Sequence, residues 1–515
     1  MKSALLILLT CLLITRTEAG SATWKSSSAS GDWNTAANWT PSTVPNGTSD
    51  IATFATSNTT AVSLSAAVAV EGIVFSPGAN AFTITSGGSS PSGFLSLTGA
   101  GVTNNSGVTQ RFLASGSTSD GPFGAITFGG NASGGSNTIF SATGTAISGG
   151  PSALTEFFEN ASGGDATFIN EGGTIANGSG AQCLLFGTST GGNATFIANG
   201  GTASGAIGGT VGLREKSSLG SGAFIANPGA NGGKGGLIEI LGKARSGTAR
   251  VQVFGDGGIN DANGRFSIAA HDERVADIGI GSLEGSGEVI IGAAGNGADS
   301  NLIVGSNNLS TVYTGVIHGV GSGGVVTKIG TGTLTLGGAN AYAGGTLVSS
   351  GTIAVTNQQG SATGLGPVQV AGGIIGGSGI IAGDVTLGTG SGSGAILDPG
   401  VNSRRPSQTT IQGALTIKAD GDYIYRLNTK RAVESNVAVN GVTLENGAQI
   451  GIATVGNVKL MAGTVFTAIS NTAATPINGT FSNLNDGSTF TVGKNAFLVS
   501  YSGGDGNDLT LTVLP

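Results

Sequence analysis

The sequence predicts an all-β protein built as a long parallel β-helix, or solenoid, with a small C-terminal β cap domain. Glycine contributes 96 of 515 residues, whereas charged residues make up 10% and aromatic residues 5%. The remaining residues are mainly Ser, Thr and Asn, which favour turns, and Val, Ile, Ala and Phe, which favour strands. Short apolar segments also recur at a fixed spacing, as expected when each coil of a solenoid packs on its neighbours.

The N-terminus has the pattern of an export signal. Lys2 supplies a positive charge, residues 4–14 form an apolar stretch, and small residues precede the expected cleavage site after Ala19. Residues 1–19 are therefore predicted to be a signal peptide, with cleavage after Ala22 as the alternative. The apolar stretch is too short to cross a bilayer, and no later segment has about 18 consecutive apolar residues, so no membrane span is expected in the mature chain.

The cysteine content excludes an internal disulfide, and the net charge restricts the kinds of partner. Cys11 lies in the signal, so Cys183 is alone in the mature chain and an internal disulfide is excluded. The apolar neighbours of Cys183 indicate a small buried residue, with a reactive thiol as the alternative. Lipidation of Cys11 would require a small residue where Thr10 stands. The net charge of −7, without a basic block, argues against nucleic acid as a partner.

Residues 20–55 contain all the tryptophans of the chain, namely Trp24, Trp33 and Trp39. We predict a Trp-rich N-terminal cap, because the open end of a solenoid exposes a sheet edge that invites aggregation. The alternative is a carbohydrate-binding platform made of aromatic faces.

Residues 56–400 are Gly-rich and periodic, and they are predicted to form the β-helix. Phenylalanine recurs every 28 residues after similar small-residue turns, at Phe140, Phe168, Phe196 and Phe224. Stacked coils place equivalent side chains about 4.8 Å apart. These four side chains are therefore predicted to form an internal aromatic ladder, and the glycines between them to supply the positive φ angles that sharp corners need.

A more specific pattern occupies residues 326–355. It reads VTKIGTGTLTLGGANAYAGGTLV and is followed by GTIAV. The stretch resembles the autotransporter-associated β-strand repeat, also called the passenger-associated transport repeat, whose pattern is K-x-G-x-G-x-L-x-L, N-x-Y-x-G-x-T and G-x-L. It departs from the pattern at Ile353, where Leu is usual. The resemblance implies a right-handed β-helix of the pectin-lyase type, secreted or displayed at the bacterial surface.

The flanks resemble the same group of proteins. The segment GDWNTAANW, residues 31–39, is similar to their usual mature N-terminus, and the end of the chain is similar to their C-terminal region. A linker near Pro406 separates residues 407–515, which are predicted to be a C-terminal β cap region. A typical autotransporter ends in a membrane barrel of roughly a dozen strands. Since this region is too short for such a barrel, we expect another export route.

One charged patch is the main candidate for catalysis, and it comprises His271, Asp272, Glu273 and Arg274. Carboxylates beside an Arg could bind calcium and promote lyase chemistry on acidic sugars. A solvated loop between coils is the simpler interpretation, because enzymes of this fold draw acidic residues from several stacked coils. His318 also lacks a neighbouring acidic motif. No catalytic residue is therefore assigned, and the patch belongs to the alternative function below.

A weak candidate for a metal site lies near the C-terminus. Residues 503–508 read GGDGND, which matches the opening of a calcium-binding nonapeptide repeat with Asp505 and Asp508 as ligands. Such sites share ligands between successive turns, whereas this segment occurs once and Thr510 replaces the large aliphatic residue. A hairpin turn is the preferred interpretation. No cofactor is predicted, and no Gly-rich segment precedes a helix as nucleotide binding would require.

The sequence therefore predicts an exported, non-catalytic scaffold located outside the cell or at its outer surface. Adhesion, or binding to a matrix, a glycan or another cell-surface ligand, is the expected function. The alternative is a polysaccharide lyase or hydrolase on a pectin-lyase-like β-helix. An acidic cluster spread over adjacent coils on one face would favour the enzyme.

Overall fold

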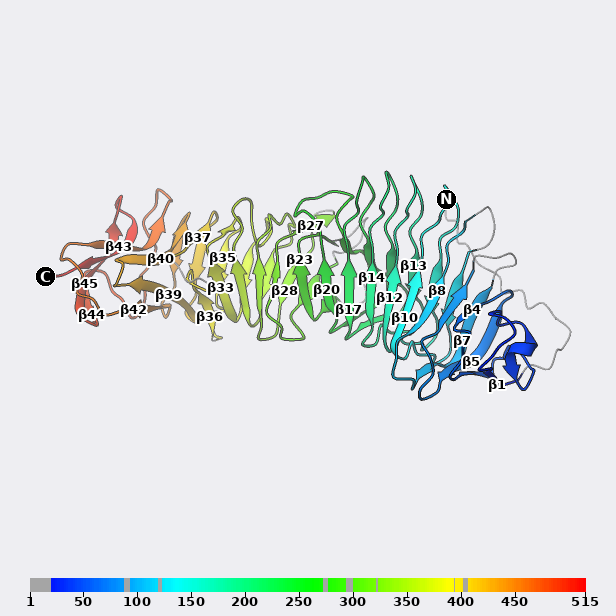
Figure 1. Cartoon of the computed structure of the whole chain (residues 1–515). Helices are drawn as coiled ribbons and strands as arrows, with labels where there is room; N and C mark the ends of the chain where they lie inside the picture. The colour runs from blue at the N-terminus through cyan, green and yellow to red at the C-terminus, as the bar shows by residue number, and fades with distance from the viewer. Residues whose placement is uncertain are drawn as a thin grey trace.

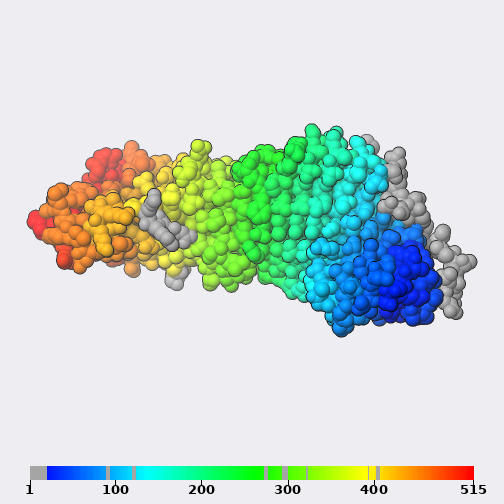
Figure 2. Space-filling view, viewed as in Figure 1, coloured from blue at the N-terminus to red at the C-terminus, as the bar shows by residue number. Residues whose placement is uncertain are grey.

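The computed structural model describes residues 20–87, 93–118, 123–271, 277–292, 300–320, 323–392, 394–401 and 406–515. The expected signal peptide, residues 1–19, lies outside them. Within these ranges the regular secondary structure comprises β-strands and one short 3-10 helix, η1 (Ala36–Asn38). The coils stack into an elongated molecule with the N-terminal coils at one end and the C-terminal strands at the other (Figures 1 and 2). The predicted all-β parallel solenoid is confirmed.

Sheet 1 forms one side of the N-terminal half and has 13 strands. Its neighbouring strands are parallel except for the first pair, which is antiparallel. In sheet order the strands are β2 (Trp39–Thr40), β1 (Ala22–Trp24), β3 (Ile51–Phe54), β5 (Val68–Phe75), β7 (Phe94–Asn104), β9 (Ala125–Phe128), β11 (Leu154–Phe157), β13 (Gln182–Leu185), β15 (Thr210–Leu213), β18 (Leu237–Gly242), β21 (Arg265–His271), β24 (Glu288–Gly292) and β27 (Val316–Val320).

Sheet 2 runs along most of the molecule through parallel pairings. In order its strands are β4 (Ala61–Ser63), β6 (Thr83–Ser86), β8 (Gln110–Ala114), β10 (Ser136–Ala142), β12 (Asp165–Asn170), β14 (Thr195–Ala198), β17 (Ala223–Ala226), β20 (Arg250–Val253), β23 (Ser282–Gly285), β26 (Thr311–Tyr313), β29 (Thr333–Leu336), β31 (Thr352–Val355), β33 (Gly373–Gly377), β36 (Ala395–Leu397), β39 (Gly421–Asn428) and β42 (Gln449–Val455). Between β23 and β26 the ladder narrows to the single pair Gly285–Tyr313.

Sheet 3 covers the third side and widens along the chain. It begins as a column of single bridges that joins Gly101, Ser133, Ser162, Thr190 and Ser218. The short pair β16 (Ser218–Gly220) and β19 (Arg245–Gly247) follows. It continues as eight parallel strands, β22 (Ile278–Ile280), β25 (Leu302–Val304), β28 (Val326–Lys328), β30 (Thr346–Val348), β32 (Val368–Val370), β35 (Val385–Leu387), β38 (Leu415–Ile417) and β41 (Val442–Leu444).

Parallel pairing continues into residues 407–515, and antiparallel strands close this end. The parallel strands are β34 (Ile380–Ile381), β37 (Gln408–Ile411), β40 (Val433–Val439) and β43 (Val465–Asn471). The antiparallel strands are β44 (Thr489–Val492), β45 (Asn495–Gly503) and β46 (Asp508–Val513). The pairing therefore changes from parallel to antiparallel at β43, which pairs with both β40 and β46.

The interior of the N-terminal half is filled by stacked aromatic rings. Phe140, Phe168, Phe196 and Phe224 occupy the same register on neighbouring strands and are at most 1% exposed. Their ring centroids lie 4.9 Å apart at each step. A second column, which contains Phe128 and Phe157, stacks at 4.6 Å and meets the first edge to face.

The three tryptophans extend this core toward the N-terminus, where their rings contact Phe54. Trp24, Trp33 and Trp39 are each at most 1% exposed. Trp39 contacts the other two indoles edge to face, with ring centroids 5.0 Å apart. Its Nε1 donates a hydrogen bond of 2.7 Å to the Trp33 carbonyl. Because the rings are buried against one another, their faces cannot serve as the carbohydrate platform considered above.

Candidate functional site

The histidine of the predicted charged patch has a structural environment. His271 is the last residue of β21 and is 4% exposed. Its Nε2 lies 2.9 Å from the carbonyl oxygen of Ala244 in the preceding coil. Asp272, Glu273 and Arg274 lie outside the described residues. The imidazole therefore connects two coils, and it is buried rather than presented to a substrate.

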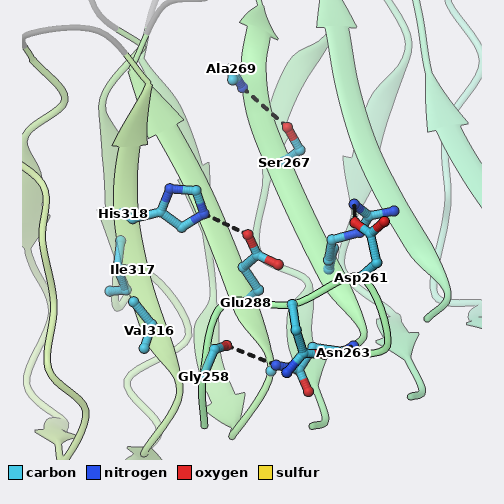
Figure 3. A network of polar contacts seen from close by, with 12 residues as sticks. Gly258, Asp261, Asn263, Ser267, Ala269, Glu288, Val316, Ile317 and His318 are labelled. Atoms are coloured by element: carbon cyan, nitrogen blue, oxygen red, sulfur yellow. Dashed lines mark hydrogen bonds and ion pairs between the residues drawn. The ribbon is translucent and has the colours of Figure 1, made fainter. Parts of the chain in front are cut away.

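A different histidine has an acidic partner. The Nε2 of His318 on β27 lies 2.6 Å from Oε1 of Glu288 on β24, the neighbouring strand of sheet 1 (Figure 3). Glu288 is 5% exposed. The charge of Glu288 also acts on Tyr313. Burial is the main cause that raises the pKa of Tyr313 well above its ordinary value, and the charge of Glu288 is the second cause. The pair lies 30 residues apart in sequence, about one coil, so inspection of local motifs missed it.

A second charged group lies beside this pair (Figure 3). The Asp261 carboxylate is 3.1 Å from Nζ of Lys234 and 3.5 Å from Nη1 of Arg265. The hydrogen bond from Lys234 is the main cause that lowers the pKa of Asp261. Cleavage of a glycosidic bond usually needs two carboxyl groups with opposite protonation tasks. Asp261 is held ionised by two cations, so it is not suited to act as the acid.

Metal binding has no support within the described ranges, where no three His, Cys, Asp or Glu side chains are placed to hold an ion. Asp508 begins β46 and pairs with Gly503 across a hairpin. Its Oδ1 accepts a hydrogen bond of 2.8 Å from the Asn471 amide. The segment of Asp505 and Asp508 is thus the tip of an antiparallel hairpin, whereas nonapeptide calcium sites need stacked parallel turns.

The segment 326–355 contains β28, β29, β30 and β31, and the corner between β29 and β30 is connected to other coils by buried polar side chains. Asn340 Oδ1 accepts a hydrogen bond of 2.7 Å from the Ile317 amide of the preceding coil. The Asn340 amide nitrogen Nδ2 donates to the Ala362 carbonyl of the following coil. The hydroxyl of Tyr342 lies 2.7 Å from Oγ1 of Thr346. The Asn, Tyr and Thr of the motif therefore satisfy buried polar groups and join three successive coils.

Comparison with known proteins gives a family match for this segment. Residues 326–355 match the family described as Passenger-associated-transport-repeat. The chain carries this repeat. No curated protein matches the chain. Among solved structures, the crystal structure of the Haemophilus influenzae Hap adhesin is similar, with 9% identity and a TM-score of 0.30. The match covers 90% of this chain but only 64% of the other, so the chain spans less than two thirds of that structure.

The lysine of the repeat points into the solenoid. Lys328 is 1% exposed, and its Nζ donates to the carbonyls of Ile329 and Gly330. A Cβ atom added at Gly351 would lie 2.7 Å from this Nζ. The nearest atom to that Cβ would be the Gly330 carbonyl oxygen, at 2.3 Å, so the glycine that begins the G-x-L part of the repeat leaves room for the preceding coil's backbone as well as for the ammonium group. Burial lowers the pKa of Lys328 to about 8.

The buried Lys328 predicts a pH-dependent stability. Its pKa is about 8 in the folded chain and about 10.4 when unfolded, so the unfolded chain binds more protons between these values. We expect the free energy of unfolding to rise with pH across this window, by up to ~3 kcal/mol. Denaturant titrations of the wild type and of Lys328→Met should differ in this slope, because other titrating groups cancel. Equal slopes would contradict the assignment.

The outer surface of the molecule has shallow hollows. The described residues contain no helix that is long and apolar enough to cross a membrane. One surface hollow, of about 460 Å³, is lined by Phe254, Leu309 and Val312 together with the ion pair of Arg250 and Glu284. Another, of about 430 Å³, lies beside the corner of Glu159 and Glu215. Both are shallow depressions on the outside of the solenoid.

Proposed function

We propose that this protein is an exported, non-catalytic surface scaffold that binds glycan or matrix ligands. The observation that carries the proposal is the passenger-associated transport repeat, which lies within a solenoid that continues on both sides of it. The expected signal peptide supports export, with a final location outside the cell or at its outer surface. A solenoid of this length offers many weak contacts along an extended surface.

The polysaccharide lyase or hydrolase remains the second candidate, because one observation favours it. The His318–Glu288 pair could exchange a proton with a bound sugar. Against this, Glu288 is almost fully buried. Asp261 is also neutralised by Lys234 and Arg265. The pair is better suited to join two strands of sheet 1.

The two candidates predict different results with purified mature protein. We expect surfaces coated with it to retain cells or matrix glycans, while pectin, alginate and similar polymers stay intact. Retention is measured against an uncoated surface, and cleavage by the release of reducing or unsaturated ends. Glu288→Gln should leave retention unchanged. Release of new ends that Glu288→Gln abolishes would overturn the proposal in favour of the enzyme.

A further inference from the structure

A column of outward-facing side chains runs along one edge of sheet 1. The register places Thr98 of β7 level with the residues that follow β9, β11, β13 and β15, namely Gly129, Phe158, Phe186 and Arg214. The rings of Phe158 and Phe186 stack with centroids 5.3 Å apart and planes 7° from parallel. Arg214 Cζ lies 6.0 Å from the ring centroid of Phe186, so a cation covers the far face of this ring.

Gly129 interrupts this column beside Phe158. A Cβ atom added at Gly129 would have only the Leu97 carbonyl oxygen nearby, at 3.9 Å. Since coils stack about 4.8 Å apart, Thr98 and Phe158 are separated by two coils, or about 9.6 Å. We call the surface over Gly129, between Thr98 and Phe158, the ledge. Phe158 is 37% exposed, and its face toward Gly129 borders the ledge.

Acidic and basic groups adjoin the ledge along the next column. Glu159 and Glu215 adopt the left-handed backbone conformation, with φ of 55° and 56°. Gly130, Gly187 and Gly242 at the equivalent corner of other coils have φ of 61°, 64° and 58°, so this conformation belongs to the corner itself. Glu159 Oε2 accepts a hydrogen bond of 2.6 Å from the Gly130 amide, and Glu215 Oε2 accepts one of 2.7 Å from the Gly187 amide. In each Glu side chain, Oε2 accepts this one backbone hydrogen bond.

The charge of this column favours an uncharged ligand. A hollow begins at Glu159, next to Phe158, and extends away from the ledge; it is lined by Glu159, Gly187, Thr188, Glu215, Lys216 and Lys243. Its two carboxylates and two ammonium groups cancel formally, so it offers hydrogen-bond acceptors and donors without a net field. A neutral, hydroxyl-rich ligand fits this surface better than a polyanion, which would face both carboxylates.

We propose that the ledge binds a sugar ring of a neutral glycan, stacked on the uncovered face of Phe158. The glycan runs along the long axis past Glu159 and Thr188. A ring that stacks on an aromatic group lies about 4.5–7 Å from its centroid, so the two-coil gap accommodates one ring. This inference rests on the proposed glycan-binding function and assigns it a surface and a ligand class.

The test fills the ledge without removing Phe158. Gly129 is not among the residues with positive φ, and the space around its Cβ is open, so Gly129→Phe extends the outer stack and should fold. We expect Gly129→Phe and Phe158→Ala each to weaken binding to immobilised neutral glucan, mannan or galactan oligosaccharides at least about tenfold. Gly129→Ala should bind as the wild type does. Phe254→Ala is the matched control, since Phe254 is also 37% exposed but lines another hollow.

Measuring cell retention in parallel with glycan binding distinguishes failure of the ledge from failure of the proposed function. Unchanged glycan binding by Gly129→Phe would overturn the ledge while leaving the proposed function intact. Cell or matrix retention by a wild type that binds no neutral glycan, or only polyanions such as polygalacturonate, would overturn the ligand class alone. Failure of both assays would overturn the proposed function as well.

Discussion

Replacing Phe196 by Ala should destabilise the central coils by ~3–5 kcal/mol, as expected for a fully buried aromatic side chain. Phe196 is 0% exposed and stacks between Phe168 and Phe224, with both centroids 4.9 Å away. Its removal leaves a cavity between coils that the stacked backbone cannot close. Because coils of a solenoid lose structure locally, amide hydrogen exchange in β12, β14 and β17 is the appropriate measurement.

Phe158→Ala is the matched control for this substitution, since Phe158 faces outward and is 37% exposed. It should change exchange in the same coils by much less. Equal effects of the two substitutions would show that the internal ladder contributes no more than a surface ring.

Replacing Trp39 by Ala should open the N-terminal end of the molecule. Trp39 is fully buried and contacts Trp24 and Trp33, and it donates a hydrogen bond to the Trp33 carbonyl. The loss should cost ~3–5 kcal/mol, because a large cavity and an unsatisfied buried carbonyl both result. Exposure of the first strands of sheet 1 should then promote edge-to-edge association.

Light scattering on heating tests this prediction about the cap. Trp39→Ala should associate at a lower temperature than the wild type. Trp39→Phe, which keeps an aromatic ring but not the N–H group, should lie between the two. A Trp39→Ala protein that stays monomeric up to the wild-type temperature would contradict a capping role for this cluster.

The periodic part of the fold was open to prediction because one chemical type recurs at one spacing. Phe140 to Phe224 share a constant interval and similar turns, so their register follows directly. Phe128 and Phe157 stack just as closely, yet they lie 29 residues apart and follow unlike turns. A change of one residue in a surface corner shifts the interval without shifting the stack, and the pattern is then lost from the sequence.

The candidate sites were harder to predict, because outward positions have no recurring residue type. His318 and Glu288 meet only because neighbouring coils pair β24 with β27. Gly129 looks like any other corner glycine until the register places it beside Phe158. The repeat at residues 326–355 was identified from its pattern. The buried position of Lys328, in contrast, depends on the path of the corner around its side chain.

The narrowing of sheet 2 has a mechanical consequence. A rod that is anchored at one end and pulled at the other transmits the same tension through every coil interface in series. In sheet 2 this tension is shared by four residue pairs between β20 and β23 and by three between β26 and β29, but by one between β23 and β26. The strands of sheets 1 and 3 at that level must bear the remainder. Sheet 1 has five residue pairs between β24 and β27 at that level, so under load we expect most of the tension at this interface to pass through sheet 1.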